Sequence, residues 1–278
     1  MTRPLVVKFG GELLEDRARL HTVVAAIAEI APKGPLVVVH GVGREIDAAL
    51  KTAGIDKRQV DGLRITDAET LEIVVAVLAG AINTRFVAAL NAAGVAAVGL
   101  TGADARCGLS VAAPPHRAVD GRLVDLERVG VPCADMDPRL LETLTRERFT
   151  PVVACIGLGA EGQLFNVNAD TLAAHLAARV KARRLVIAGT TPGVLDDRQQ
   201  TLPRLESTAV DELVTGGTAT AGMIAKLRAC EHALAGGVDD VVIVDGRERD
   251  ALVAAADDEA PPRATRLSAG QRTCATER

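Results

Sequence analysis

The chain has 278 residues, of which 48% are hydrophobic and 24% charged, a balance typical of folded globular proteins and not of disordered ones. Its net charge of −4 and its aromatic content of 1% argue against a nucleic-acid binder, which needs a basic surface or base-stacking platforms. The five cysteines form no CxxC pair and no Cys/His cluster with zinc spacing, so we expect reduced thiols, no metal centre and a cytoplasmic location.

The first expected strand, at Leu5-Val6-Val7, follows directly on Met-Thr-Arg-Pro, which is not the pattern of a signal peptide. Further short apolar runs along the chain are also expected to be strands, and each ends at a turn that contains glycine. These runs are 36–39, 96–100, 151–156, 185–188 and 241–244.

Segments rich in Ala, Leu and Glu separate the expected strands and are expected to be helices. They lie near 16–31, 44–53, 67–93, 138–148, 169–181, 208–216, 221–236 and 248–256. Strand, glycine turn and helix in repeated alternation predict an α/β fold with a mostly parallel sheet and helices on both faces. Ligands of such folds bind beyond the carboxyl ends of the strands, where these glycine turns fall.

Three segments depart from this alternation. Residues 104–136 are charged and are expected to form a hairpin or loop excursion. The longest apolar run, 73–82, is too short to span a bilayer, so we expect no membrane segment. Residues 259–278 are polar and weakly patterned, which predicts a flexible tail.

Lys8 stands before two glycines, Gly10 and Gly11, at the end of the first expected strand. Glycines let the backbone approach a phosphate closely, and the start of the next helix favours negative charge. The pattern therefore indicates a phosphate site, although an ordinary strand-to-helix turn with a surface lysine would look the same.

The segment from His40 to Asp47 reads His-Gly-Val-Gly-Arg-Glu-Ile-Asp and joins the second strand to a helix, again a geometry that favours anions. Ile46 occupies the third glycine position of GxGxxG, and the chain contains no GxxxxGK[ST] motif. The sequence therefore does not indicate a Rossmann site or a P-loop.

Three later motifs add candidate polar groups. Arg64 lies just before an expected helix start at Thr66-Asp67 and could bind a carboxylate through two hydrogen bonds, or simply face solvent. Asn166, Asn168 and Asp170 lie at a loop-to-helix junction, where capping of the helix is the alternative role.

The last motif is a glycine-threonine loop at 216–220 that leads into a helix. This helix carries Lys226 about one turn from its start, so the loop suits a polyphosphate and the lysine can reach a transferred group.

These five motifs occur in this order over residues 4–256: Lys-x-Gly-Gly, His-Gly-x-Gly, Gly-Leu-Arg-Ile-Thr, Asn-Val-Asn-Ala-Asp and Gly-Met-Ile-x-Lys. Together they resemble the N-acetylglutamate kinases of the amino acid kinase family. The resemblance implies a three-layer αβα sandwich around a mainly parallel sheet. It also implies transfer of phosphate from ATP, with Mg²⁺, to the side-chain carboxylate of N-acetyl-L-glutamate, the second step of arginine synthesis.

The resemblance also implies a role for each matching residue. Lys8 and Lys226 would neutralise charge on the transferred phosphoryl group, and Asp170 would orient both lysines. Arg64 would bind the substrate α-carboxylate, and Asn166 its amide region. Residues near the acceptor or the phosphates would be Val42, Gly43, Gly10, Gly11 and Gly41, and residues near the nucleotide would be Thr190, Gly193, Thr218, Ala219 and Thr220.

By the same resemblance, residues 1–168 would form a lobe for the acyl acceptor and for dimerisation, and 169–258 a lobe for ATP. A homodimer that arginine does not inhibit is expected, because arginine-inhibited members carry a helix before the first strand.

Two alternatives remain. The acceptor could be an aminoadipate or glutamate linked to a carrier protein. Alternatively, the chain could be a catalytically silent amino-acid-binding homologue, because Val42 stands where the family usually has the middle of three glycines.

Overall fold

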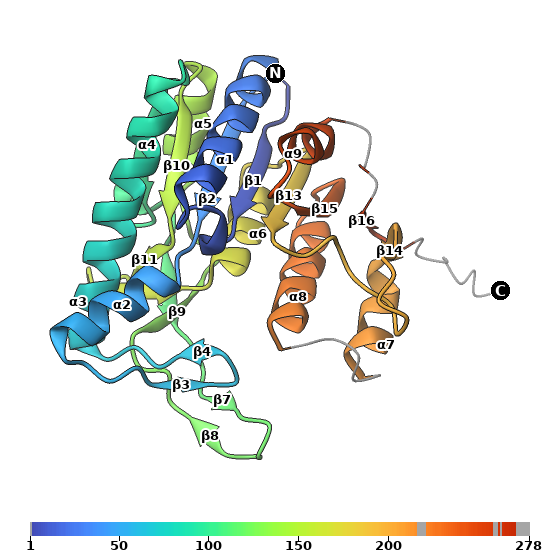
Figure 1. The fold of residues 1–278 in the computed structure, drawn as a ribbon. Coiled ribbons are helices and arrows are strands. Elements are labelled where there is room, and N and C mark those ends of the chain that lie inside the picture. Colours follow the sequence, from blue (N-terminus) through green and yellow to red (C-terminus); the bar gives the residue numbers. More distant parts are fainter. Residues whose placement is uncertain (1, 216–220, 258–260, 262, 271–278) are drawn as a thin grey trace.

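A computed structural model describes residues 2–215, 221–257, 261 and 263–270 (Figure 1). Its centre is an eight-stranded sheet in the order β14-β16-β15-β13-β1-β2-β10-β5. Neighbouring strands are parallel except for the pair β15 and β16, so the predicted mainly parallel sheet is confirmed. The strands are β1 Leu5–Phe9, β2 Leu36–His40, β5 Ala97–Thr101, β10 Thr150–Ala154, β13 Arg184–Gly189, β14 Arg204–Glu206, β15 Asp240–Asp245 and β16 Ala264–Ser268.

Helices cover both faces of this sheet, which gives the predicted three layers (Figure 1). Successive strand residues point to opposite faces, so Val7 and Val38 belong to one core and Val6 and Val37 to the other. The first core is covered by α1 Arg17–Ile30, α4 Asn83–Ala92 and α9 Arg249–Ala256. The second is covered by α2 Arg44–Ala53, α3 Ala68–Val75, α5 Arg139–Arg146, α6 Ala169–Arg179, α7 Val210–Thr215 and α8 Ala221–Ala235.

The helix expected at 67–93 is confirmed as one continuous helix, in which α3 continues through a π-helical segment, Ala76–Ile82, into α4. The resulting helix, Ala68–Ala92, is long and apolar enough by composition to cross a membrane. About a third of the residues in its most apolar part, 33%, are buried inside the protein. It is longer than the apolar run considered in the sequence. Because Val74, Leu78 and Phe86 pack into the two cores, we interpret it as a helix covering the sheet.

The predicted excursion at 104–136 is confirmed and forms two small sheets (Figure 1). One sheet, in the order β11-β12-β9-β6, also takes in two strands that follow β10, and the other is the β7–β8 hairpin. A separate hairpin, β3–β4, lies beside them in Figure 1. Their bounds are β3 Gln59–Val60, β4 Leu63–Arg64, β6 Ser110–Ala112, β7 His116–Arg117, β8 Leu123–Val124, β9 Val129–Pro132, β11 Ile156–Leu158 and β12 Leu164–Val167.

The expected flexible tail at 259–278 is wrong for residues 264–268, which form β16 inside the central sheet. Ala264 and Leu267 are buried there, and Arg266 forms an ion pair with Asp240 at 2.5 Å. Only three of these five side chains are apolar or β-branched, which is a weak strand pattern. Pairing with β15, and not local propensity, therefore makes this segment a strand.

Candidate active site

Two glycine turns touch each other beyond the carboxyl ends of the neighbouring central strands β1 and β2. A Cβ atom on Gly11 would lie 2.6 Å from the Cα of Val42, so only glycine permits this approach. Gly41 is restricted in the same way, because its Cβ would lie 2.9 Å from the Cβ of Ala169 at the start of α6. The two predicted phosphate turns and the start of α6 therefore meet at one place.

A buried cluster of three charges lies beside these turns. Lys8, on β1, places its Nζ 2.7 Å from Oδ1 of Asp170, and Lys226, on α8, places its Nζ 3.2 Å from Oδ2. The side chain of Lys8 is 8% exposed, that of Asp170 11% and that of Lys226 14%. Asn168 caps α6 by accepting hydrogen bonds from the backbone of Asp170 and Thr171, which leaves the Asp170 carboxylate for the lysines.

The cluster carries one excess positive charge, since two ammonium groups share one carboxylate. Burial opposes ionisation of Asp170, but Lys8 and Lys226 outweigh it and lower the pKa of Asp170 to about 2. Burial also opposes the charge on Lys8, yet the adjacent carboxylate raises the pKa of Lys8 above its usual value. Burial and repulsion by Lys8 lower the pKa of Lys226. A buried excess charge of this kind suits an anionic ligand.

Arg64 enters the same region from the β3–β4 hairpin. One terminal nitrogen, Nη2, donates a short hydrogen bond to the carboxylate of Asp47 and lies 3.5 Å from the carbonyl oxygen of Gly43. The other, Nη1, is buried and has no hydrogen-bond partner among the described residues. Hydrogen bonds from Lys57 and Arg64 outweigh burial and lower the pKa of Asp47, so this carboxylate is charged and holds half of the guanidinium group.

A cavity of about 300 Å³ connects these groups. Asn166, on β12, lines it and donates from Nδ2 to the hydroxyl of Thr66 at 3.1 Å. The predicted site residues that line this cavity are Lys8, Gly10, Gly11, Gly41, Val42, Gly43, Arg64 and Asn166. Asp170 and Lys226 contact this set through the charge cluster.

Val42 does not strain its turn. It is absent from the described non-glycine residues with positive φ, and its side chain is partly buried against both cores. Its backbone therefore keeps a conformation that valine adopts readily. Val42, the residue that raised the alternative of a silent homologue, is therefore compatible with an intact turn.

Of the predicted nucleotide residues, Thr190 and Gly193 do not line this cavity. Thr190 and Gly193 follow β13, and Gly193 has φ +88° and packs against Thr265, which leaves no room for a side chain. Thr218, Ala219 and Thr220 lie outside the described residues.

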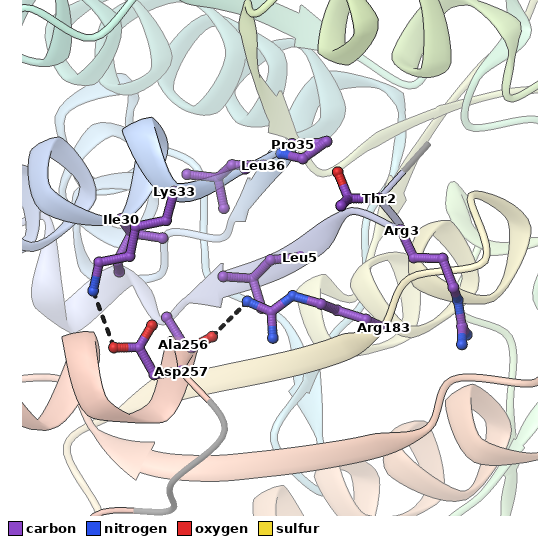
Figure 2. A pocket seen from close by; sticks show the side chains of 11 residues that line it. Thr2, Arg3, Leu5, Ile30, Lys33, Pro35, Leu36, Arg183, Ala256 and Asp257 are labelled. Atoms are coloured by element: carbon purple, nitrogen blue, oxygen red, sulfur yellow. Dashed lines mark hydrogen bonds and ion pairs between the residues drawn. The ribbon is translucent and has the colours of Figure 1, made fainter.

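A second cavity, of about 410 Å³, lies at the opposite, amino-terminal ends of β1 and β2 and contains none of the predicted site residues (Figure 2). Its charged groups contact neighbouring protein groups. Lys33 Nζ lies 3.0 Å from a carboxylate oxygen of Asp257, and Arg183 donates to the carbonyl oxygen of Ala256 at 2.7 Å (Figure 2). The candidate site is therefore the smaller cavity at the carboxyl ends.

Sequence reasoning missed three residues of this site. Asp47 was part of a quoted motif, but its contact with Arg64 depends on a hairpin that was not predicted. Glu12 and Cys155 also line the cavity, and no spacing signal distinguishes either one. Burial raises the pKa of the Cys155 thiol to about 12, so this thiol is protonated and unreactive.

Comparisons with known proteins show which family the chain belongs to. The family model described as "Amino acid kinase family" matches residues 3–245. Proteins named acetylglutamate kinase from Rhodospirillum centenum and Rhodopseudomonas palustris (strain ATCC BAA-98 / CGA009) are each 40% identical to the chain. The alignments cover 90% and 87% of this chain and 84% and 83% of theirs.

Solved structures show the same fold. N-acetylglutamate synthase from Neisseria gonorrhoeae aligns with a TM-score of 0.80 at 24% identity, over 96% of this chain and 60% of that one. Carbamate kinase from Giardia lamblia aligns with a TM-score of 0.67 at 14% identity, over 96% and 99%. With the matched family model and the 40% identical relatives, these findings establish that the chain belongs to the amino acid kinase family.

Proposed function

We propose that the chain is a cytoplasmic enzyme that transfers the γ-phosphoryl group of ATP to the side-chain carboxylate of N-acetyl-L-glutamate. The product would be N-acetyl-L-glutamyl 5-phosphate, the second intermediate of arginine synthesis. The charge cluster of Lys8, Asp170 and Lys226 beside two touching glycine turns carries this proposal. The relatives that cover most of the chain and are named acetylglutamate kinase support the choice of acceptor.

The chemistry requires positioning and charge more than proton transfer. The side-chain carboxylate of the acceptor, with an ordinary pKa of ~4.3, is already ionised at neutral pH. It therefore attacks phosphorus without a general base. Lys8 and Lys226 would neutralise the charge that develops on the phosphoryl oxygens, and Asp170 holds both ammonium groups in place. The backbone N–H groups of Gly11 and of the 41–43 turn would donate to the same oxygens.

ATP would enter with Mg²⁺ bound to its phosphates, and a buried excess positive charge with glycine turns fits such a polyphosphate. Thr190, Gly193 and the 218–220 loop would contact the nucleotide. All residues that line the cavity precede residue 169 except Ala169 itself, which supports a lobe for the acceptor at 1–168. Residues 169–258 would then form the lobe for ATP.

Arg64→Lys should raise KM for the acceptor about 10-fold or more and leave KM for ATP nearly unchanged. Arg64 lines the cavity and its Nη1 has no hydrogen-bond partner among the described residues, and a lysine cannot keep Asp47 and the substrate in one planar fork. Steady-state kinetics with each substrate varied in turn measures both constants. Arg58→Lys, in a more exposed ion pair with Asp67, is the control. Equal rises in both KM values would assign Arg64 to the fold or to the nucleotide.

A screen of acceptors tests the choice of substrate. Hydroxylamine converts an acyl phosphate to a hydroxamate, whose iron(III) complex is coloured, so product formation can be compared for N-acetylglutamate, glutamate, N-acetylaminoadipate and a carrier-linked aminoadipate. We expect N-acetylglutamate to give the highest kcat/KM. A higher kcat/KM for the carrier-linked acceptor would identify that compound as the substrate in place of N-acetylglutamate. No hydroxamate from any acceptor would indicate a silent homologue.

We further propose a homodimer built on the outer face of the long helix 68–92. Ala76, Gly80, Thr84 and Ala88 are exposed there at intervals of four residues, beside the edge strand β5. Light scattering should give about twice the chain mass of 28.9 kDa. A Cβ on Gly80 meets nothing within 4 Å, so Gly80→Arg should fold and halve the mass. A wild-type mass of one chain would contradict the proposal.

A further inference from the structure

Asn83, the first residue of α4, makes two buried hydrogen bonds whose geometry fixes its orientation. Its Nδ2 lies 2.9 Å from the carbonyl oxygen of Val152 on β10 and 2.9 Å from Nε2 of His40. A carbonyl oxygen only accepts, so Nδ2 is the donor there, and its second N–H donates to His40. Nε2 of His40 is therefore the unprotonated nitrogen, and Nδ1 carries the proton.

His40 immediately precedes the 41–43 turn and is fully buried. Its ring packs edge-on against Phe86, with centroids 5.9 Å apart, and its carbonyl oxygen accepts a hydrogen bond from the Cys155 thiol at 2.9 Å. Burial lowers the pKa of His40 to about 4, so the ring stays neutral at physiological pH. His40 does not line the cavity, but the turn that follows it does, through Gly41, Val42 and Gly43.

Two features of the surroundings make room for Asn83. A Cβ on Gly99, in the edge strand β5, would lie 2.3 Å from Oδ1 of Asn83, so glycine is needed there. The π-helical segment Ala76–Ile82 ends directly before Asn83. Buried positions recur every four residues along this helix, and an α-helix rotates its face by about 40° over each such step. The wider π turn offsets this rotation and keeps the row that contains Leu78, Ile82 and Phe86 buried, and Asn83 follows Ile82 directly.

We propose that Asn83 is a positioning residue for phosphoryl transfer, because it fixes the tautomer and orientation of His40 and thereby the 41–43 turn. The proposal rests on the proposed function for its kinetic consequence only. The turn N–H groups must meet the phosphoryl oxygens closely, and a misplacement of ~1 Å can cost on the order of 10²-fold in rate. Asn83 itself touches no substrate in this arrangement.

The test compares Asn83→Leu with Asn91→Leu. Asn91, two turns further along α4, also donates to a strand carbonyl oxygen, that of Ala97 at 3.0 Å, and makes no contact with His40. Asn83→Leu should lower kcat about 10- to 100-fold and change both KM values less than about threefold. Asn91→Leu should retain wild-type kcat. Gly99→Ala should reproduce the kcat loss, because its methyl group displaces the Asn83 amide.

Nitrogen-15 NMR of the imidazole provides a readout that does not depend on activity. The wild type should show His40 protonated at Nδ1 alone, and Asn83→Leu should shift this tautomer and the amide signals of Gly41 and Gly43. Asn91→Leu should change none of these signals. Wild-type kcat in both Asn83→Leu and Gly99→Ala, or an unchanged tautomer in Asn83→Leu, would overturn the proposal. An inactive wild type would instead refute the proposed function, and the tautomer would still test the contact.

Discussion

Replacing Lys226 by alanine is expected to lower kcat by on the order of 10²-fold or more, with much smaller changes in both KM values. The ammonium group lies 3.2 Å from Asp170 in a buried cluster, where a charge acts on the phosphoryl oxygens with little screening by water. If each lysine supplies ~3 kcal/mol of stabilisation to the transition state, removing one costs this factor in rate. Lys8→Ala should behave in the same way, and steady-state kinetics of hydroxamate formation measures both.

The matched controls for this prediction are Lys51→Ala and Lys226→Arg. Lys51 is exposed on α2, and its loss should leave kcat unchanged. Because the pKa of Lys226 is lowered below its usual 10.5, wild-type kcat should fall at alkaline pH as this group loses its proton. Lys226→Arg stays charged there, so its residual activity should lack that fall. A near-normal kcat for Lys226→Ala would remove Lys226 from the mechanism.

Asp170→Asn is expected to damage both stability and activity. The substitution leaves two buried ammonium groups without a counter-charge, which typically costs about 3–5 kcal/mol of unfolding free energy. It also releases the two lysines from their fixed separation, so kcat should fall at least as far as for either lysine variant. Chemical denaturation and kinetics on the folded fraction separate the two effects.

The pH dependence of stability gives this second prediction a sharper form. Asp170 has a pKa of about 2 in the folded protein against an ordinary value of 3.8, so it stabilises the fold above pH 4 and loses that contribution as pH falls towards 2. The wild-type unfolding free energy should fall more steeply across this range than that of Asp170→Asn. Adding Lys226→Met to Asp170→Asn should restore part of the stability at neutral pH. Independent, additive losses would mean that the two groups are not coupled.

The sequence was sufficient for the central parallel strands, for the main helices between them and for the order of the motifs. Runs such as Leu36–Val39 are apolar throughout, because a central parallel strand is buried on both faces, and their periodicity differs clearly from that of the helices between them. The glycine turns were predictable because a parallel sheet brings its carboxyl ends together. The meeting of Lys8 and Asp170, which are 162 positions apart (170 − 8), was expected only from the family resemblance.

What the sequence left undetermined depends on packing between distant segments. β16 is short and half polar, so only its pairing with β15 makes it a strand. The contact of Asn83 with His40 joins a helix to a strand 43 positions away, and no local pattern encodes it. The β3–β4 hairpin could have been predicted, because Asp61-Gly62 with two positive φ values is a preferred two-residue turn. Arg64 lies on this hairpin as well as just before α3.

The central claim is that a substrate carboxylate attacks the γ-phosphoryl group of ATP at the Lys8–Asp170–Lys226 cluster. N-acetylglutamate labelled with oxygen-18 in its side-chain carboxylate tests this directly, with hydroxylamine present to cleave the acyl phosphate at carbon. We expect one oxygen-18 atom in each phosphate released. With Lys226→Ala, labelled phosphate should form on the order of 10²-fold more slowly. Phosphate without the label would show that water accepts the phosphoryl group, and labelled AMP with pyrophosphate would show adenylation; either result would contradict the account.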